Sequence, residues 1–166
     1  MNTMNRTTPE LPLPKLSLAV QYASAAQDMP TRAQLRRWIK PALQSDARMT
    51  LRIVDEIEGR ELNKDYRGKD YATNVLTFVY DDTGVLCGDV VICAPVVARE
   101  AATQHKDRLA HYAHLVIHAV LHLQGYNHES DAAAAEMEAL ETALMVKLRY
   151  SDPYRETRTK NGRTRK

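Results

Sequence analysis

Cysteine is scarce in this chain, which excludes a small fold held together by disulfides. The 166 residues include only Cys87 and Cys93, and these lack the C-x-x-C spacing of redox and zinc pairs. We therefore expect two buried, reduced thiols beside a strand rather than a disulfide or a metal pair. No internal repeat is visible either, which argues against a solenoid or a propeller.

Long apolar runs are also missing. No stretch approaches the ~20 apolar residues that a membrane helix requires. The segment that ends at Pro14 is polar and contains Pro9 and Pro12, so it has no apolar core of a signal peptide. We expect a cytoplasmic protein without a membrane partner.

The net charge is only +2, but it is unevenly distributed. Within residues 155–166, six basic residues oppose one acidic residue, Glu156. We expect residues 1–14 to be a flexible leader, 15–150 to form one domain and 151–166 to be a disordered basic tail. Such a tail would either add salt-sensitive affinity for phosphate backbones or only keep the chain end solvated.

Apolar periodicity and turn residues predict one α/β (α+β) domain, with a mixed four-stranded sheet packed by about five helices. Thr31 has the character of a helix N-cap, and the turn residues at 81–84 indicate a hairpin. The expected strands are 16–22, 49–54, 74–80 and 85–93, and the expected helices are 31–43, 55–62, 95–104, 107–124 and 130–149.

Three histidines, His118, His122 and His128, are spaced so that one divalent metal could touch all of them. The first two lie four apart in a Gly- and Pro-free run, so a helix would place both imidazoles on one face, roughly 6 Å apart along its axis. Gly125 tolerates the left-handed backbone that ends such a helix, and the short segment after it can turn His128 back toward the pair. The pattern predicts one metal ion per chain.

Neutral imidazoles suit Zn²⁺, and three protein ligands leave a position for water, as in a catalytic zinc site. The alternative is that His118 and His122 are partly buried helix histidines with hydrogen-bond partners. The pattern matches the zinc-protease motif H-E-x-x-H only in part, because Ala119 stands where a protease has its general-base Glu. This departure counts against peptide hydrolysis.

The chain resembles the YbeY family of bacterial endoribonucleases from about residue 16 to residue 149, on two separate motifs. The first comprises Leu62, Asn63, Tyr66, Arg67, Gly68, Asp70, Thr73, Asn74, Val75, Leu76, Thr77 and Phe78, with Gly88, Asp89, Val90, Val91 and Ile92 after it. The second comprises His114, His118, His122, Leu123, Gly125, Tyr126, Asn127 and His128, followed by Glu136, Met137, Glu138 and Glu141. Ala119, Asn127 and Thr77 replace the family's usual Gly, Asp and Ser, and none of these changes removes a metal ligand or Arg67.

The resemblance implies a zinc-dependent, single-strand-specific endoribonuclease that acts in rRNA processing, at the 3′ end of 16S rRNA, and in ribosome quality control. Its partners would be single-stranded RNA, ribosomal RNA or the ribosome itself. A ribosomal protein or a ribosome-associated GTPase is a further candidate partner.

The same resemblance implies that Arg67 is catalytic, although spacing alone would favour an ordinary surface arginine. Its guanidinium would neutralise charge that develops on the phosphate oxygens. Asp70 is expected to hold Arg67, and Tyr66 and Phe78 would either stack on bases or pack in the core. Asn63 and Thr73 would fix the intervening loop or contact the substrate.

Other histidines are expected to lie outside the metal's reach. His114 is one helical turn from His118, so it would orient a ligand or meet the substrate from the cleft. His105 and His111 are expected to face solvent.

In the expected mechanism, zinc on the three histidines lowers the pKa of its water from 15.7 toward ~7. Whether hydroxide attacks phosphorus or deprotonates the ribose 2′-OH stays open. Two other functions also stay open: a zinc peptidase or amidase with the same ligands, and a ribosome-assembly factor with a mainly structural metal site.

Overall fold

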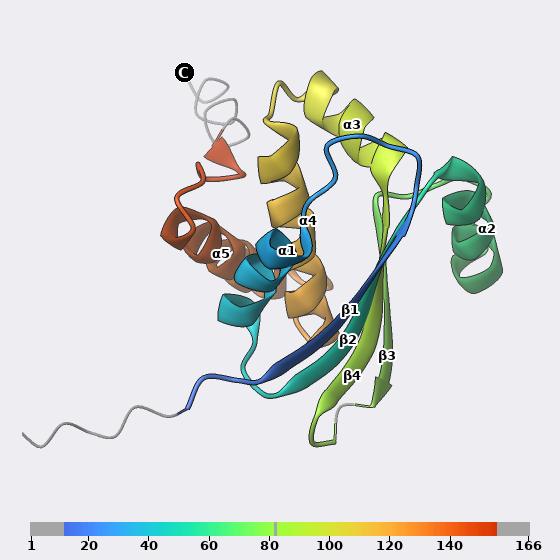
Figure 1. The fold of residues 1–166 in the computed structure, drawn as a ribbon. Helices are drawn as coiled ribbons and strands as arrows, with labels where there is room; N and C mark the ends of the chain where they lie inside the picture. The colour runs from blue at the N-terminus through green and yellow to red at the C-terminus, as the bar shows by residue number, and fades with distance from the viewer. Residues whose placement is uncertain (1–11, 82, 156–166) are drawn as a thin grey trace, which may run out of the picture.

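A mixed sheet runs through the centre of the molecule, with its strands in the order β1-β2-β4-β3 (Figure 1). The computed structural model describes residues 12–81 and 83–155. Strands β1 (Leu16–Ala23), β2 (Ala47–Val54) and β4 (Leu86–Cys93) are parallel, and β3 (Val75–Asp81) pairs antiparallel with β4. The predicted mixed, four-stranded sheet is confirmed.

The predicted hairpin joins β3 to β4. Its register shifts between Val79 and Asp81, and the Thr83 amide donates a hydrogen bond to Asp81 Oδ1 at 3.0 Å. An aspartate that accepts from the residue two positions later is a common device for closing a tight turn.

Five α-helices surround the sheet, as predicted, and their starts follow the capping signals in the sequence. Thr31, Asp107 and Ser130 each accept a hydrogen bond from a backbone amide of the helix that follows. The helices are α1 (Arg32–Ile39), α2 (Glu56–Arg67), α3 (Ala94–Thr103), α4 (Arg108–Leu123) and α5 (Asp131–Lys147), with a 3₁₀ turn η1 (Lys40–Ala42) after α1. Helix α2 is longer than expected, because it ends only where Gly68 adopts a left-handed φ of 69°.

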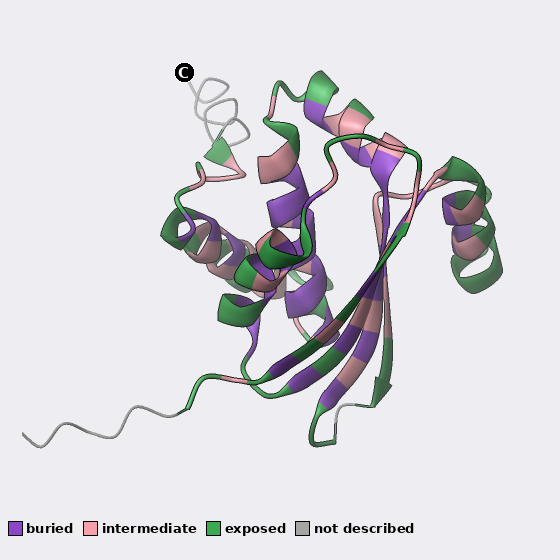
Figure 2. Cartoon of the chain, viewed as in Figure 1, coloured by how far each residue is buried: buried purple, intermediate pink, exposed green. Residues whose placement is uncertain are grey.

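The two faces of the sheet are covered unequally (Figures 1 and 2). One face packs under α1, α4 and α5 in the main core, where Leu35, Trp38 and Ile53 are fully buried. The other face carries a smaller cluster that includes Val54 and Leu76, and α2 contributes only the half-buried Leu62 to it. The large core therefore lies on the side of the histidine-bearing helix.

Both cysteines are free thiols, as expected. Cys93 is buried at the end of β4, and burial raises the pKa of its thiol, whereas Cys87 is only partly buried. Between residues 12 and 155, leaving out residue 82, no helix combines the length and hydropathy needed to cross a membrane.

The first residues of the expected C-terminal tail lie within the part of the chain that the structure describes. Residues 151–155, expected to belong to a disordered tail, contact the domain: Lys106 Nζ donates to the Pro153 carbonyl at 3.1 Å. The rest of the expected tail, 156–166, and most of the expected leader, 1–11, lie outside the described residues.

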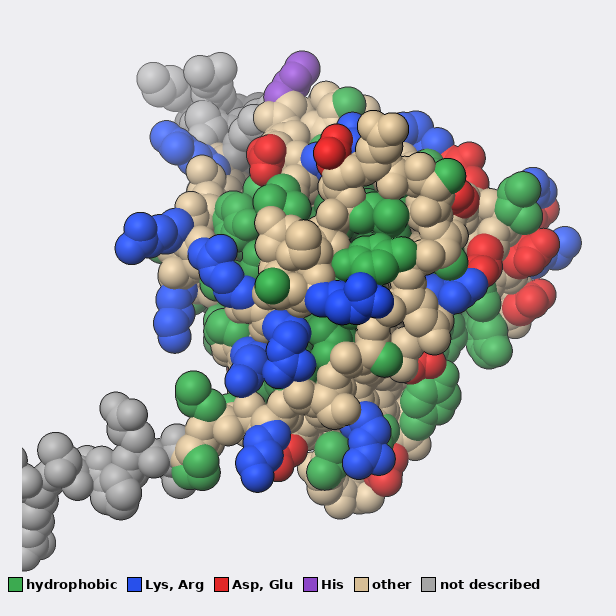
Figure 3. Space-filling view, in the orientation of Figure 1, with side chains coloured by type: hydrophobic (Ala, Val, Ile, Leu, Met, Phe, Trp, Pro, Cys, Tyr) green, Lys and Arg blue, Asp and Glu red, His purple; other side chains and the backbone are tan. Residues whose placement is uncertain are grey.

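Charged side chains are also distributed unequally. Lys and Arg side chains gather over α1 in Figure 3, whereas Asp and Glu side chains gather over α2 at the right of the view. The side of α1 is therefore richer in basic side chains, whereas α2 carries charges of both signs.

Candidate functional site

Helix α4 and the loop after it bring three histidine rings together. His118 and His122 lie four residues apart on α4, and their ring centroids are 6.5 Å apart with nearly parallel planes. The helix ends before Gly125, whose φ of 101° lets the chain turn sharply. The chain then places His128 with its ring centroid 5.0 Å from that of His118. The rings of His122 and His128 thus each lie near that of His118.

Two of these rings are held through one nitrogen. His118 Nδ1 donates to the Glu141 carboxylate, and His122 Nδ1 donates to the Tyr126 carbonyl at 3.0 Å. Carboxylate and carbonyl oxygens only accept hydrogen bonds, so each ring has a proton on Nδ1, and the neutral form of each ring has its lone pair on Nε2. Metal-ligating histidines are commonly oriented in this way.

The donor set fits zinc in kind, since neutral imidazoles with supported Nδ1 atoms are its usual ligands. The distance from a metal to the centroid of a ligating imidazole is the ~2.1 Å bond plus the distance from the nitrogen to the ring centre. Two such rings at the tetrahedral angle have centroids roughly 5 Å apart. The pair His118 and His128 has this spacing, whereas His118 and His122 are further apart. Among the described residues, no three His, Cys, Asp or Glu side chains surround a single ion position.

Glu141 is the carboxylate behind His118. It is completely buried on α5, where it accepts from His118 and Tyr154, and His114 Nε2 lies 3.6 Å from its second oxygen. Burial alone would raise the pKa of Glu141, but the hydrogen bonds from His114, His118 and Tyr154 outweigh it and lower that pKa to about 2. The carboxylate is therefore ionised and positioned to hold His118.

Tyr154 supports the same carboxylate from outside the helices. Its hydroxyl donates to Glu141, and its ring lies edge-on to the His114 ring, with centroids 5.3 Å apart. Burial and the adjacent Glu141 charge raise the pKa of Tyr154, so it stays a protonated donor. His114 thus contacts both Glu141 and Tyr154, and Tyr154 comes from the segment expected to be a tail.

The loop that carries His128 is tied to the segment after α1. Gln124 Nε2 donates to the Ala42 carbonyl at 2.7 Å, and the Gln44 side chain donates to the Tyr126 hydroxyl at 2.6 Å. A pocket of about 270 Å³ lies against this loop, lined by residues that include Asn127 and Glu136. The loop next to the histidines is thus both supported and accessible.

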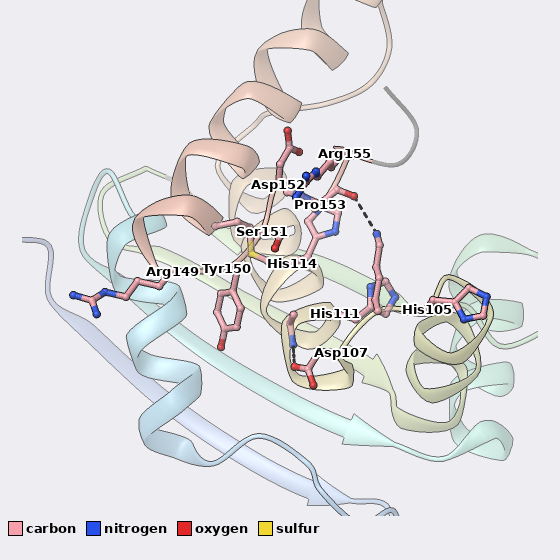
Figure 4. A pocket seen from close by; sticks show the side chains of 13 residues that line it. His105, Asp107, His111, His114, Arg149, Tyr150, Ser151, Asp152, Pro153 and Arg155 are labelled. Atoms are coloured by element: carbon pink, nitrogen blue, oxygen red, sulfur yellow. Dashed lines mark hydrogen bonds between the residues drawn. The ribbon is translucent and has the colours of Figure 1, made fainter. Parts of the chain in front are cut away.

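A larger pocket, of about 660 Å³, lies elsewhere on α4 (Figure 4). It is lined by His111 and His114 from α4 and by residues of the 149–155 segment, and Lys106 bonds Pro153 at its rim. The three grouped histidines do not line it. His114 therefore lies between this pocket and the Glu141 carboxylate.

Arg67 lies apart from the histidines in the fold. It is the last residue of α2, exposed, on the side of the sheet opposite α4 (Figure 1). In the described part of the chain, no hydrogen bond or ion pair joins Arg67 to a histidine. Asp70 does not hold Arg67 as expected, because Arg60 binds both of its carboxylate oxygens, at 2.7 and 3.0 Å.

The neighbours of Arg67 take up the loop and packing roles considered for them. The Tyr66 ring packs edge-on against Phe78, with centroids 4.9 Å apart, and Tyr66 stays largely exposed. Asn63 is completely buried and donates to the Tyr71 carbonyl at 2.7 Å, so it fixes the loop and cannot itself reach a substrate. Thr73 is half-buried in that loop.

The expectation that His111 faces solvent is wrong. Its ring is 5% exposed, and Nε2 lies 3.0 Å from Glu100, which also accepts from the Asn74 amide at 3.1 Å. The hydrogen bond from His111, against the opposite effect of burial, lowers the pKa of Glu100. A carboxylate from another helix compensates the burial of the ring, and sequence spacing does not reveal such a partner. His105 is exposed, as expected.

Two supporting residues were not assigned a role from the sequence. Glu141 had a detectable signal: it stands between Met137 and Met145 at four-residue spacing, in the buried stripe of α5. An acidic residue in an apolar stripe requires a buried partner. Tyr154 had no such signal, because its contact with Glu141 depends on the path of the chain after α5.

The chain is similar in sequence to known proteins over most of its length. The family profile described as Endoribonuclease YbeY matches residues 20–149. Endoribonuclease YbeY of Aromatoleum aromaticum is 57% identical over 143 residues, which cover 84% of this chain and 93% of the relative. Endoribonuclease YbeY of Methylobacillus flagellatus is 54% identical over 142 residues, covering 86% and 95%.

The fold also has a solved counterpart. The solution structure of TM1509 from Thermotoga maritima aligns with a TM-score of 0.51 at 24% identity, covering 80% of this chain and 91% of that one. At this identity the likeness concerns the fold alone. The profile and the relatives cover both motifs and all three grouped histidines, and on that basis the chain belongs to the YbeY endoribonuclease family.

Proposed function

We propose that the protein is a zinc-dependent endoribonuclease that cleaves single-stranded RNA, with His118, His122 and His128 as ligands of one zinc ion. Family membership supports the endoribonuclease role. The observation that carries the metal assignment is the pair of Nδ1 hydrogen bonds, from His118 to Glu141 and from His122 to Tyr126. These bonds leave the Nε2 atom of each ring available to coordinate a metal.

When bound, zinc supplies an activated water and a positive charge for the phosphate. The chain's own residues do the positioning. Glu141 keeps His118 in one tautomer and orientation, and the Tyr126 carbonyl does the same for His122. Arg67 is proposed to neutralise charge on the phosphate oxygens; it has no carboxylate partner among the described residues, so its charge is available.

For the biological role, we propose rRNA processing, at the 3′ end of 16S rRNA, together with ribosome quality control in the cytoplasm. The partners would be ribosomal RNA or the ribosome, with a ribosomal protein or a ribosome-associated GTPase as a further candidate. The family name supports the RNA substrate, and the particular RNA is an extension from it.

The test is cleavage of a labelled single-stranded RNA by wild type, Arg67→Ala and His118→Ala, with folding checked by circular dichroism and zinc by elemental analysis. We expect both variants to fold and to lose cleavage, and only His118→Ala to lose zinc. Cleavage retained in both variants would contradict the proposal. Unfolding of His118→Ala would instead favour a structural metal site in an assembly factor.

The attacking group is tested separately. A substrate with one 2′-deoxy position at the cleavage site removes the ribose nucleophile and leaves the phosphate unchanged. If the 2′-OH attacks, this substrate should not be cut, and persistent cleavage would mean that water attacks phosphorus directly.

A further inference from the structure

We propose that helix α1 presents a surface that binds the phosphate backbone of single-stranded RNA and leads it to the histidine site. We name this surface the α1 basic face and define it by five side chains: Arg32, Arg36, Arg37, Lys40 and Arg149. The inference rests on the proposed function, because it extends the same RNA beyond the cleavage position.

The charge of this face is almost purely positive. From residue 11 to residue 45, the chain contains one acidic residue, Asp28, which lies in the loop before α1. Four of the five basic side chains are exposed, and Arg36 is half-buried. Figure 3 shows Lys and Arg side chains gathered over this side with few carboxylates between them. Such a surface attracts a polyanion without regard to sequence.

Three of the guanidinium groups are oriented by neutral partners. Arg36 Nη1 donates to the Leu16 carbonyl at 3.2 Å, and Arg32 Nη2 donates to the Val20 carbonyl at 3.3 Å. Arg37 Nη2 lies 3.4 Å from the carbonyl of Leu148. A carbonyl fixes the direction of a guanidinium but does not cancel its charge, so the remaining N–H groups can bind phosphate.

The arginines on the other side of the sheet are arranged differently. Arg52 pairs with Glu58 at 2.6 Å, Arg60 pairs with Asp70 at 2.7 Å, and Arg99 pairs with Glu56. Between residues 12 and 155, residue 82 aside, no carboxylate forms an ion pair with a member of the α1 basic face. These three arginine–carboxylate pairs thus all lie outside the α1 basic face, whose five members make no ion pair within the described residues.

The spacing of the face suits an extended strand. Arg32, Arg36 and Lys40 stand at four-residue intervals, which places them along one side of the helix with a rise of about 6 Å per step. Arg149 follows α5 and is among the residues that line the large pocket, and in Figure 4 its side chain extends alongside α1. The adjacent Leu148 is the residue that Arg37 contacts. The charges thus form a row rather than a single spot.

The row of basic side chains ends near the loop that carries His128. Lys40 begins η1, and the carbonyl of Ala42, the last residue of η1, accepts from Gln124. Gln124 is followed by the loop whose Tyr126 carbonyl holds His122. A strand held along α1 would therefore arrive beside the histidines, which is why we assign RNA rather than an acidic protein or a membrane as the occupant.

The test measures binding of a fluorescent single-stranded RNA as a function of salt. The RNA has about 16 nucleotides, the upper end of the site sizes of single-strand-binding OB folds. The test variant is Lys40→Gln with Arg149→Asn, which removes two charges but none of the hydrogen bonds to β1. Asn suits position 149 because its φ is 70°. The matched control is Arg48→Gln with Lys64→Gln, two exposed charges outside the face.

Each phosphate contact contributes about 0.7 to the slope of log K against log salt for single strands. We expect the test variant to lose about 1.4 from that slope and to bind several-fold more weakly at low salt. The control should keep the wild-type slope. Circular dichroism establishes that both variants fold.

Equal slopes for wild type and the test variant would overturn the proposal. So would a loss of binding to phosphatidylglycerol vesicles in the test variant without a loss of RNA binding, since the face would then serve a membrane. Cleavage by wild type is measured on the same RNA. Its absence would contradict the proposed function, whereas the binding slopes decide independently on the α1 basic face.

Discussion

The two faces of the central sheet differ in how they are held together. Under α1, α4 and α5, side chains such as Trp38 and Tyr112 are almost completely buried, and the ionised Glu141 carboxylate is fully enclosed. Under α2, the packed cluster is small, Tyr66 and Ile57 are exposed, and ion pairs lie at the surface. The grouped histidines belong to the first face and Arg67 to the second.

The difference shows where precise geometry can be maintained. A buried carboxylate keeps one arrangement, because any other leaves charge without partners in an apolar environment. An exposed ion pair is readily replaced by water and contributes little. His118 is therefore held by the core through Glu141, whereas the exposed ion pairs on the α2 side contribute little to fixing its geometry.

Truncating a core side chain should give the largest difference in stability between the two faces of the sheet. Leu35→Ala, in the fully buried position on α1, should cost roughly 3 kcal/mol or more, because it leaves a cavity that α4 cannot fill. Leu62→Ala, in the half-buried position on α2, should cost only about 1 kcal/mol. Urea unfolding of both variants measures the difference, and equal costs would mean that the α2 side is packed as firmly as the other.

Loss of the buried carboxylate should act on the metal. Glu141→Gln cannot accept from all the donors around it, so we expect zinc affinity to fall about 10- to 100-fold. Competition with a chelating dye measures this affinity. Glu138→Gln, on the same helix and only half-buried, is the control and should bind zinc like wild type. Unchanged affinity in Glu141→Gln would show that His118 needs no carboxylate.

Glu100, on α3, links α4 to the segment before β3, because it binds His111 on α4 and Asn74 just before β3. The pKa of Glu100 is lowered in the folded protein, so its stabilisation is present above the usual glutamate range and is lost as pH falls through the lowered pKa. At pH 7 we expect the free energy of unfolding of wild type to exceed that of Glu100→Gln by about 1 kcal/mol. Urea unfolding curves should show this difference in stability disappearing below about pH 4. A difference that stays constant with pH would mean that the charge of Glu100 does not cause it.

The smallest effect is expected on the α2 surface. Arg60→Gln removes a bidentate but exposed pair with Asp70, and its thermal midpoint should match that of wild type at moderate salt. A clear loss of stability would show that this pair holds the loop after α2, and the contrast between the two faces would then be weaker.

Much of the fold could be predicted because local signals agree with the packing. Thr31, Asp107 and Ser130 are capping residues in the sequence and in the structure. The end of α2 was predicted too early, because residues 63–67 are mostly polar and give no apolar stripe, yet their helix continues until Gly68. A left-handed glycine is the signal that marks this end.

In the candidate site, too, the residues placed by local spacing could be predicted, whereas their partners from distant parts of the chain could not. Histidines four apart on one helix can be placed from spacing, and so can the return of His128 after Gly125. The partners Glu141, Tyr154 and Glu100 lie on other elements, 11 to 40 residues away along the chain from the histidines they bind. The pairing of Asp70 with Arg60 rather than Arg67 depends on side-chain direction at the end of α2, which spacing alone does not determine.

Tyr154 has a consequence for biosynthesis. It lies beyond residues 20–149, where the family profile matches, and near the end of the chain, yet its hydroxyl holds the carboxylate that orients His118. Chains emerge from the ribosome with the N-terminus first. A nascent chain therefore contains α4 and Glu141 before it contains Tyr154, and the support of His118 is complete only after residue 154 has been added.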